Sequence, residues 1–258
     1  MEIHDTNTFL HVKHSIRWWS SLKVYLVAYT PNPEDLVYTA IKTCVSKKPP
    51  SELAKKEKSI EEKRKLIRKI VRMGHHSVLE HVSFTFFIEG VSRVCTHQLV
   101  RHRIASYTQQ SQRHVKVKGG FVTPKSIEGD PRAKRVFEEV ARKAVEAYKA
   151  LLEMGVPPED ARYVLPQAIK TNIVVTMNAR SLLNFFRLRC CLKSQWEIRE
   201  VAWEMLKLVK KVAPSIFENA GPPCMTEGRC PEEDFDCPLK SQLTTSSSGV
   251  SLPVCKEP

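Results

Sequence analysis

The sequence predicts an α+β fold, with a few strands among several amphipathic helices. Side chains alternate in character along residues 22–30 and 82–89, which is the two-residue period of a strand. Other segments repeat apolar residues at three- and four-residue spacing between capping signals, as helices do. The chain has 258 residues and is 42% hydrophobic, which is ample for a core.

Capping residues mark the helices that follow the first strand. Asn32 and Pro33, with acidic residues after them, predict a helix that runs to about residue 46. The Lys-rich residues 52–73 are predicted to form a second helix, which restarts at Ser59 if Ser59 and Glu62 make a capping box.

Two helices and an extended segment are predicted after the second strand. Ser92 and the apolar spacing behind it predict a helix over residues 92–103, and residues 113–122 are predicted to be extended. Asp130 opens a long helix that ends at Gly155. We expect the apolar face of this long helix to pack in the core through Val136, Val140, Ala144, Tyr148, Leu151 and Leu152.

The last elements are again a strand and two helices. A β-branched run at residues 173–176 predicts the strand, and Asn178 is placed to cap a helix that reaches about residue 191. Ser194 and Glu197 are predicted to form a capping box for a helix that runs to about residue 211.

Composition constrains the partners of the chain. Lys and Arg total 41 against 28 Asp and Glu, a formal charge of +13, which predicts anionic partners such as nucleotides, a folate tail, nucleic acid or a membrane surface. No apolar run approaches the ~20 residues of a membrane span, and the first residues lack the pattern of a signal peptide. We therefore expect a cytoplasmic protein that does not enter the membrane.

Histidine and cysteine clusters raise the question of a metal site. His76 and His81 are five residues apart, whereas two ligands on one helix face need a spacing of four, so we expect no metal there. A structural or cofactor-contacting role fits these histidines better. The C-terminal cysteines are spaced more widely than usual zinc ligands, and free thiols and disulfides both remain open: Cys224, Cys230, Cys237 and Cys255.

Residues 101–111, here called the signature segment, read Arg-His-Arg-Ile-Ala-Ser-Tyr-Thr-Gln-Gln-Ser. The basic triplet falls at the end of the predicted helix 92–103, where the helix dipole favours cations and where guanidinium groups can bind phosphate through two bonds. The polar residues beyond it suit a heterocycle or a sugar phosphate. Composition alone equally allows a solvated basic helix end followed by a polar loop.

The pattern Arg-His-Arg, seven residues, Ser resembles the signature of the flavin-dependent thymidylate synthases, and the resemblance extends over residues 22–218. The family order also holds for Gly74-His75, Glu80-His81, Ser111-Gln112-Arg113, Asn178-Ala179-Arg180-Ser181 and Gln195-Trp196-Glu197. The resemblance implies a mixed β-sheet flanked by helices, in a single domain that assembles as a homotetramer with active sites between subunits. Residues 1–21 and 219–258 are then an N-terminal extension and a Cys-, Pro- and Ser-rich tail.

The family methylates dUMP to dTMP, with methylene-tetrahydrofolate as carbon donor, FAD as hydride carrier and NADPH as reductant. By resemblance, the residues expected to bind FAD are Ser77, Arg101, His102, Arg103, Gln109, Asn178, Arg180 and Asn184. Those expected to bind dUMP are Gln98, Arg101, Gln109, Ser111, Gln112, Arg113, Arg162 and Arg189. Arg189 is expected to be catalytic, because a guanidinium beside the uracil stabilises charge that develops on the ring. No enzyme nucleophile is then required.

Two positions depart from several family members, which carry Glu at Gln109 and His at Lys193. Two other functions also remain possible. A basic nucleic-acid-binding protein would explain the charge, although no aromatic-interleaved or zinc-finger pattern supports it and we expect no nucleic acid. A flavin reductase with another acceptor would explain FAD but would leave Arg162 and Arg189 without a role.

Overall fold

The computed structural model describes residues 22–55, 58–117, 120–231 and 237, so the predicted extension 1–21 lies outside the described residues. The described chain divides into two compact units. We call the described residues of 22–28 and 85–176 the sheet unit, and the described residues of 29–84 and 177–237 the helical unit. Each unit is considered on its own.

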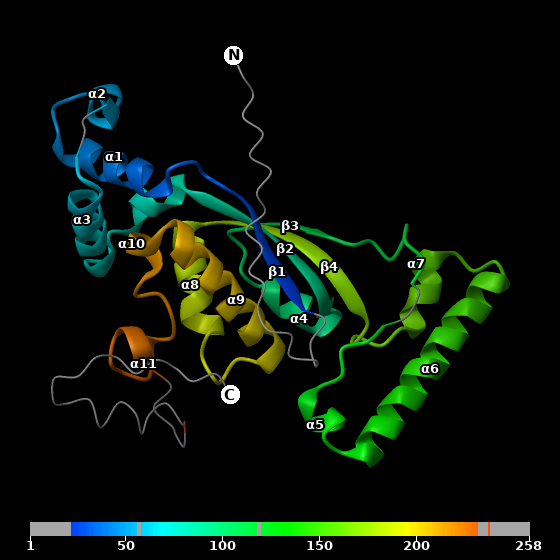
Figure 1. Ribbon diagram of the computed structural model, residues 1–258. Coiled ribbons are helices and arrows are strands. Elements are labelled where there is room, and N and C mark those ends of the chain that lie inside the picture. Colours follow the sequence, from blue (N-terminus) through cyan, green and yellow to red (C-terminus); the bar gives the residue numbers. More distant parts are fainter. Residues whose placement is uncertain (1–21, 56–57, 118–119, 232–236, 238–258) are drawn as a thin grey trace. The chain divides into compact units, whose positions relative to one another are not determined.

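The strands form a four-stranded sheet in the order β1-β2-β4-β3 (Figure 1). Its members are β1 Lys23–Tyr29, β2 Ser83–Ser92, β3 Ser106–Gln109 and β4 Lys170–Asn178. β3 runs antiparallel to β4, with Ser106 opposite Thr176 and Gln109 opposite Ile173. The predicted α+β class is confirmed. β3 was not predicted, because its polar residues occupy a strand that is only half buried.

Short helices and one long helix complete the sheet unit. They are α4 Arg93–Leu99, α5 Lys125–Glu128, α6 Pro131–Glu153, α7 Pro158–Ala161 and the 3₁₀ turn η2 Arg162–Val164. Two predicted N-caps are confirmed, since the side chain of Ser92 accepts from the amide of Cys95 and that of Asp130 accepts from the amide of Arg132.

Three predictions for the sheet unit were wrong. The helix expected over residues 92–103 spans only Arg93–Leu99. It begins after Ser92, where β2 ends, and it stops at Leu99 because the chain turns after Val100. The described residues of the segment 113–122, which are 113–117 and 120–122, are not extended throughout, and among them only Phe121 forms a β-bridge, with Ile169.

The predicted core face of α6 is also only partly buried. Tyr148 is buried at 1% exposure, whereas Val136 and Val140 are 64% and 56% exposed. The helix therefore keeps an apolar strip at the surface of the single chain.

The helical unit contains the other helices of the described residues. They are α1 Pro33–Val45, α2 Pro50–Lys55, α3 Ile60–Arg72, the 3₁₀ helix η1 His76–His81, α8 Ala179–Arg189, α9 Trp196–Val212, α10 Pro214–Phe217 and α11 Pro223–Thr226. The aromatic rings of Phe84 and Phe186 each meet the ring of Phe217 edge-on, at centroid distances of 5.4 and 6.0 Å. This cluster joins α8 and α10 to the end of β2 within the unit's core.

Capping in the helical unit follows the sequence at two helices and departs from it at two. Ser59 and Glu62 form the expected capping box, and the cap of α8 is the expected Asn178. Gln195, not Ser194, caps α9, because its longer side chain accepts from the amides of Glu197 and Ile198. Asn32 precedes α1 in a left-handed conformation (φ 46°) without a side-chain cap bond.

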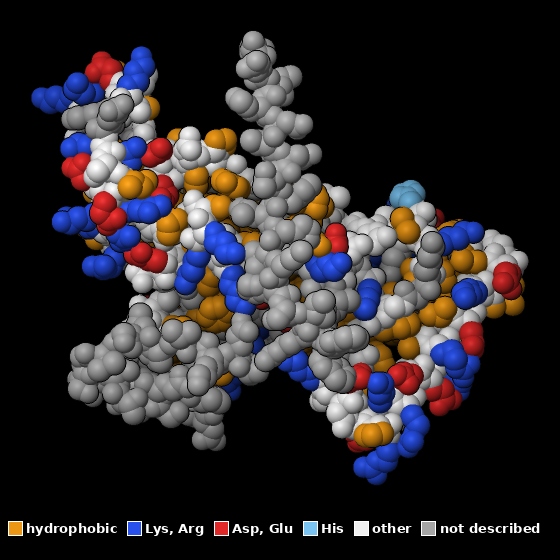
Figure 2. All heavy atoms as spheres, in the orientation of Figure 1, with side chains coloured by type: hydrophobic (Ala, Val, Ile, Leu, Met, Phe, Trp, Pro, Cys, Tyr) orange, Lys and Arg blue, Asp and Glu red, His pale blue; other side chains and the backbone are white. Residues whose placement is uncertain are grey.

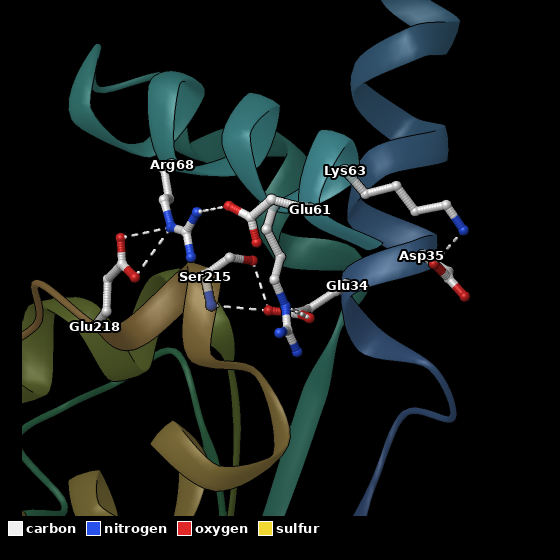
Figure 3. A network of polar contacts seen from close by, with 8 residues as sticks. Glu34, Asp35, Glu61, Lys63, Arg68, Ser215 and Glu218 are labelled. Atoms are coloured by element: carbon white, nitrogen blue, oxygen red, sulfur yellow. Dashed lines mark hydrogen bonds and ion pairs between the residues drawn. The ribbon is translucent and has the colours of Figure 1, made fainter. Parts of the chain in front are cut away.

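A buried carboxylate connects three helices of this unit (Figure 3). Glu34 of α1 has a side chain only 8% exposed. It accepts from the amide and the hydroxyl of Ser215 at 2.8 and 2.6 Å, and from Nε of Arg64 at 2.8 Å. These bonds link α1 to α3 and to the start of α10, where the helix dipole also favours a negative charge.

We predict that Glu34→Ala lowers the free energy of unfolding by roughly 3 kcal/mol, because it leaves a guanidinium and two donors of Ser215 without their acceptor. The neighbouring Asp35→Ala is the matched control. Asp35 pairs with Lys63 at 2.7 Å but is 50% exposed, so its loss costs no more than about 1 kcal/mol. Urea unfolding measures both variants, and equal losses would show that burial does not govern this network.

Candidate active site

The basic triplet of the signature segment lies in the turn between α4 and β3. The hydroxyl of Tyr107 lies 2.9 Å from the carbonyl of Leu99 and 2.8 Å from that of His102, and it shares its one proton between them. Burial raises the pKa of Tyr107 to about 12, so the hydroxyl stays a donor. Tyr107 of β3 thus holds the backbone of the turn in place, while the side chains of Arg101 and Arg103 are exposed.

Gln109 is fixed in orientation by two buried threonines. Its Nε2 donates to the hydroxyl of Thr96 at 3.0 Å and to that of Thr171 at 3.3 Å. The hydroxyl of Thr96 donates its own proton to the carbonyl of Arg93, so it can only accept from Gln109. A carboxylate at position 109 could not donate these bonds, which gives a physical reason for the Gln in this chain.

Two arginines expected to bind the substrate meet at α7. Nε of Arg113 pairs with the carboxylate of Glu159 at 2.7 Å, and Nε of Arg162 donates to the backbone carbonyl of Glu159 at 2.9 Å. The Arg113 pair is more than half exposed on the arginine side, so it is weak and open to exchange with another anion. The structure thus brings these two predicted residues together around one residue of α7.

Sequence reasoning did not single out Arg93, which belongs to the same group. Its Nη2 donates to the carbonyl of Gln110 at 3.1 Å, next to the predicted substrate residues Ser111 and Gln112. Arg93 stands one residue after the Ser92 cap, and the position resembled an ordinary surface arginine of a helix. Only the folded chain reveals that it is partly buried.

The helical unit brings together four residues expected to bind FAD. η1, which carries Ser77, packs against α8, which carries Arg180 and Asn184 and is capped by Asn178. The guanidinium of Arg180 pairs with the carboxylate of Glu80 in η1. The side chains of Ser77, Arg180 and Asn184 are exposed. They present a hydroxyl, a guanidinium and an amide, the donors that recognise pyrophosphate and ring carbonyls.

Arg189 lies at the last position of the same helix but on a different face. Nine residues at 100° each place Arg189 about 180° around α8 from Arg180. The next residue, Cys190, is 1% exposed, and burial raises the pKa of its thiol well above the ordinary range. Such a thiol is protonated at neutral pH and is a poor nucleophile.

Half of the six basic residues of α3 pair with carboxylates, namely Lys63, Arg64 and Arg68. Figure 2 shows Lys and Arg over α2 and α3 with Asp and Glu among them. Arg68, for example, contacts Glu61 at 2.7 Å and Glu218 at 2.9 Å. This mixture of signs lacks the single-sign surface that favours nucleic acid.

The described part of the chain contains neither a membrane-spanning helix nor a metal-binding cluster of side chains. Within it, no helix combines the length and the apolar character that a bilayer crossing needs. Nor do three or more His, Cys, Asp or Glu side chains of the described residues group in a way that could hold a metal ion. His76 instead has its Nε2 3.0 Å from the carbonyl of Val71.

Comparisons with known proteins agree with the signature segment. The family model described as thymidylate synthase complementing protein matches residues 25–215. A flavin-dependent thymidylate synthase of Geobacter sulfurreducens is 52% identical over 219 residues, which are 84% of this chain and 94% of the relative. One of Clostridium tetani is 47% identical over 239 residues, which are 86% of this chain and 95% of the relative.

A solved structure is similar in fold as well as in sequence. It is the UMP/dUMP methylase PolB of Streptomyces cacaoi, bound with 5-Br dUMP, with a TM-score of 0.67 and 27% identity. The match covers 77% of this chain and 94% of the PolB chain. The family model and the relatives together show that this chain belongs to the flavin-dependent thymidylate synthase family.

Proposed function

We propose that the protein converts dUMP to dTMP by reductive methylation, with methylene-tetrahydrofolate as carbon donor, FAD as hydride carrier and NADPH as reductant. The observation that carries the proposal is the family membership, together with the intact signature segment. The relatives are named for this activity, and PolB was solved with a dUMP analogue. The overall stoichiometry would be dUMP, methylene-tetrahydrofolate and reduced FAD giving dTMP, tetrahydrofolate and FAD. The methyl group would take its carbon and two hydrogens from the methylene group and one hydride from reduced FAD, while the C5 proton and the second hydrogen of reduced FAD account for the two N–H groups of tetrahydrofolate.

The donors present in each unit fit FAD. Arg101 and Arg103 in the sheet unit and Arg180 in the helical unit are exposed cations that can bind a pyrophosphate. Ser77 and Asn184 add neutral donors for the polar rings. FAD, when bound, supplies hydride transfer, and the protein residues supply position and charge.

Substrate binding is assigned to the arginines around α7 and to the polar residues before them. Arg113 and Arg162 are placed by Glu159, and Gln109 is held in one orientation by Thr96 and Thr171. A phosphate can compete with the exposed Glu159 carboxylate for Arg113, since both are anions and the phosphate carries more charge. Gln98, Ser111 and Gln112 complete the proposed dUMP set within the sheet unit.

Arg189 is the proposed catalytic residue. Its guanidinium stabilises negative charge that develops on the uracil ring as C5 becomes nucleophilic. A protein thiol is unnecessary on this route, in agreement with the buried and protonated state of Cys190.

The proposal includes a homotetramer whose sites are shared between subunits. Arg180 and Arg189 lie on about opposite faces of α8. This supports active sites shared between subunits, because two residues on opposite faces of one helix can belong to two different sites. The exposed valines of α6 give an apolar strip that assembly would cover. A cytoplasmic location follows from the nucleotide and folate substrates.

The reaction is tested with purified protein, dUMP, methylene-tetrahydrofolate, NADPH and FAD. We expect a yellow protein with a flavin spectrum. Chromatographically identified dTMP should disappear when dUMP, methylene-tetrahydrofolate or NADPH is omitted, or when the bound flavin has first been removed. A colourless protein that binds nucleic acid would contradict the proposal. A yellow protein that oxidises NADPH without ever forming dTMP would favour the flavin reductase.

We predict that Cys190→Ala retains turnover within about tenfold of wild type, because the buried thiol takes no part in the chemistry. Cys191→Ala, in the adjacent position, is the matched control and should behave alike. Loss of dTMP synthesis in a folded, flavin-loaded Cys190→Ala variant would refute the mechanism without a nucleophile.

Arg189→Ala should lose turnover far more than dUMP affinity, because its charge acts mainly on charge that develops during reaction. The expected loss is ~3–4 kcal/mol of transition-state stabilisation, or roughly 10²–10³-fold in kcat. Single-turnover kinetics and dUMP binding separate the two effects. Equal losses in both would reduce Arg189 to a binding residue.

Shared sites predict complementation between two inactive variants. Arg113→Ala and Arg189→Ala lie on opposite sides of the proposed site, so refolding them together makes hybrid interfaces with one intact and one doubly altered site. About a quarter of the sites should recover activity. Mixing without subunit exchange is the control, and a hybrid tetramer proven by mass spectrometry that remains inactive would contradict shared sites.

A further inference from the structure

Arg93 has an environment that ordinary packing does not explain. Among the described residues, its Nε is buried and has no hydrogen-bond partner. A buried donor on a charged group that lacks an acceptor typically costs more than 1 kcal/mol. Structures keep such a group where strain, water or a ligand accounts for it.

The charge of Arg93 is also uncompensated. No carboxylate of the described residues pairs with it, and its one side-chain bond goes from Nη2 to the neutral carbonyl of Gln110. Burial lowers the pKa of Arg93, and the nearby positive charge of Arg162 lowers it further. The positive charges of Arg93 and Arg162 therefore repel each other, and no carboxylate of the described residues pairs with Arg93 to relieve this repulsion.

The surroundings hold both guanidiniums in place without neutralising them. The Gln110 carbonyl that anchors Arg93 belongs to a residue tied to Asn172, whose main-chain carbonyl accepts from the amide of Gln110 at 2.9 Å. Arg162 is anchored through Nε by the carbonyl of Glu159 at 2.9 Å. Backbone carbonyls thus position both groups before an anion arrives, which is the arrangement expected of a preorganised anion site.

We propose that Arg93, together with Arg162, binds the 5′-phosphate of the nucleotide substrate. This assignment rests on the proposed function and extends it to a residue outside the predicted set. A phosphate dianion between the two guanidiniums would accept from the buried Nε of Arg93 and would remove the repulsion from Arg162. It would also lie beside Ser111, Gln112 and Arg113, which follow Gln110 in the chain.

If Arg93 binds the 5′-phosphate, it should strengthen the binding of a nucleotide but not that of the corresponding nucleoside, which has the same base and no phosphate. The test measures affinities of flavin-loaded, full-length protein for dUMP and for deoxyuridine by calorimetry. Arg93→Met keeps an unbranched side chain of about the size of the aliphatic part of arginine and removes the charged guanidinium. We expect the ratio of the two affinities to fall about 10- to 100-fold, with deoxyuridine binding unchanged within about twofold.

Arg142→Met is the matched control. It removes the same charge from the same unit, but Arg142 is 60% exposed and paired with Glu146 on the surface of α6. Its affinity ratio should equal that of wild type, which excludes a general effect of net charge.

Arg93→Lys provides a second variant if Arg93→Met does not fold. It keeps the positive charge but loses the Nε donor and the planar fork, so its ratio should fall by about fivefold or more. An unchanged ratio in a folded Arg93 variant, or equal losses for dUMP and deoxyuridine, would overturn the assignment.

Binding and turnover separate this proposal from the proposed function. A protein that binds dUMP through Arg93 but forms no dTMP would keep the phosphate assignment and lose the reaction. A wild-type protein that does not distinguish dUMP from deoxyuridine would refute the phosphate assignment itself.

Discussion

The antiparallel pairing of β3 with β4 is the interaction on which the candidate site of the sheet unit depends. It turns Gln109 toward the hydroxyl of Thr171 on β4 and places the carbonyl of Gln110 where Arg93 can donate to it. The pairing also directs Tyr107 back to the carbonyls of the turn that carries His102. The four residues of β3 thereby fix the turn before the strand and Gln110 after it. A shift of the β3–β4 register by one residue would turn the side chains of Tyr107 and Gln109 to the other face of the sheet.

Backbone carbonyls hold two of the arginines of the candidate site, Arg93 and Arg162. A cluster of positive groups resists folding unless each is solvated, paired or anchored. Arg162 is anchored by a main-chain carbonyl, Arg113 by an exposed carboxylate and Arg93 by a carbonyl alone. Such weak or neutral anchors leave the charge available for an anionic substrate, whereas the buried Arg64–Glu34 pair of the helical unit is fully committed to structure.

Local signals in the sequence predicted the elements whose ends are set by their own side chains. The caps Ser92, Asp130 and Asn178 lie where the pattern placed them, because each bond spans two or three residues. β3 was missed, since its polar residues become a strand only by pairing with a strand far along the chain.

Arg93 escaped sequence analysis for a similar reason. Its partial burial and the effect of the Arg162 charge on its pKa arise only in the folded chain, because the two residues are 69 positions apart in the sequence. Conversely, Val136 and Val140 matched a core pattern but are exposed in the single chain. Periodicity identifies an apolar face without saying whether the same chain covers it.

In the proposed mechanism a flavin, and no protein nucleophile, drives methylation of dUMP at C5. Release of tritium from dUMP labelled at C5 tests it most directly, because formation of dTMP replaces the C5 hydrogen with a methyl group. We expect tritium release to match dTMP formation and to require FAD, reductant and methylene-tetrahydrofolate. We also expect it to persist in Cys190→Ala. Release that continues in protein stripped of flavin, or that stops when Cys190 alone is replaced, would contradict it.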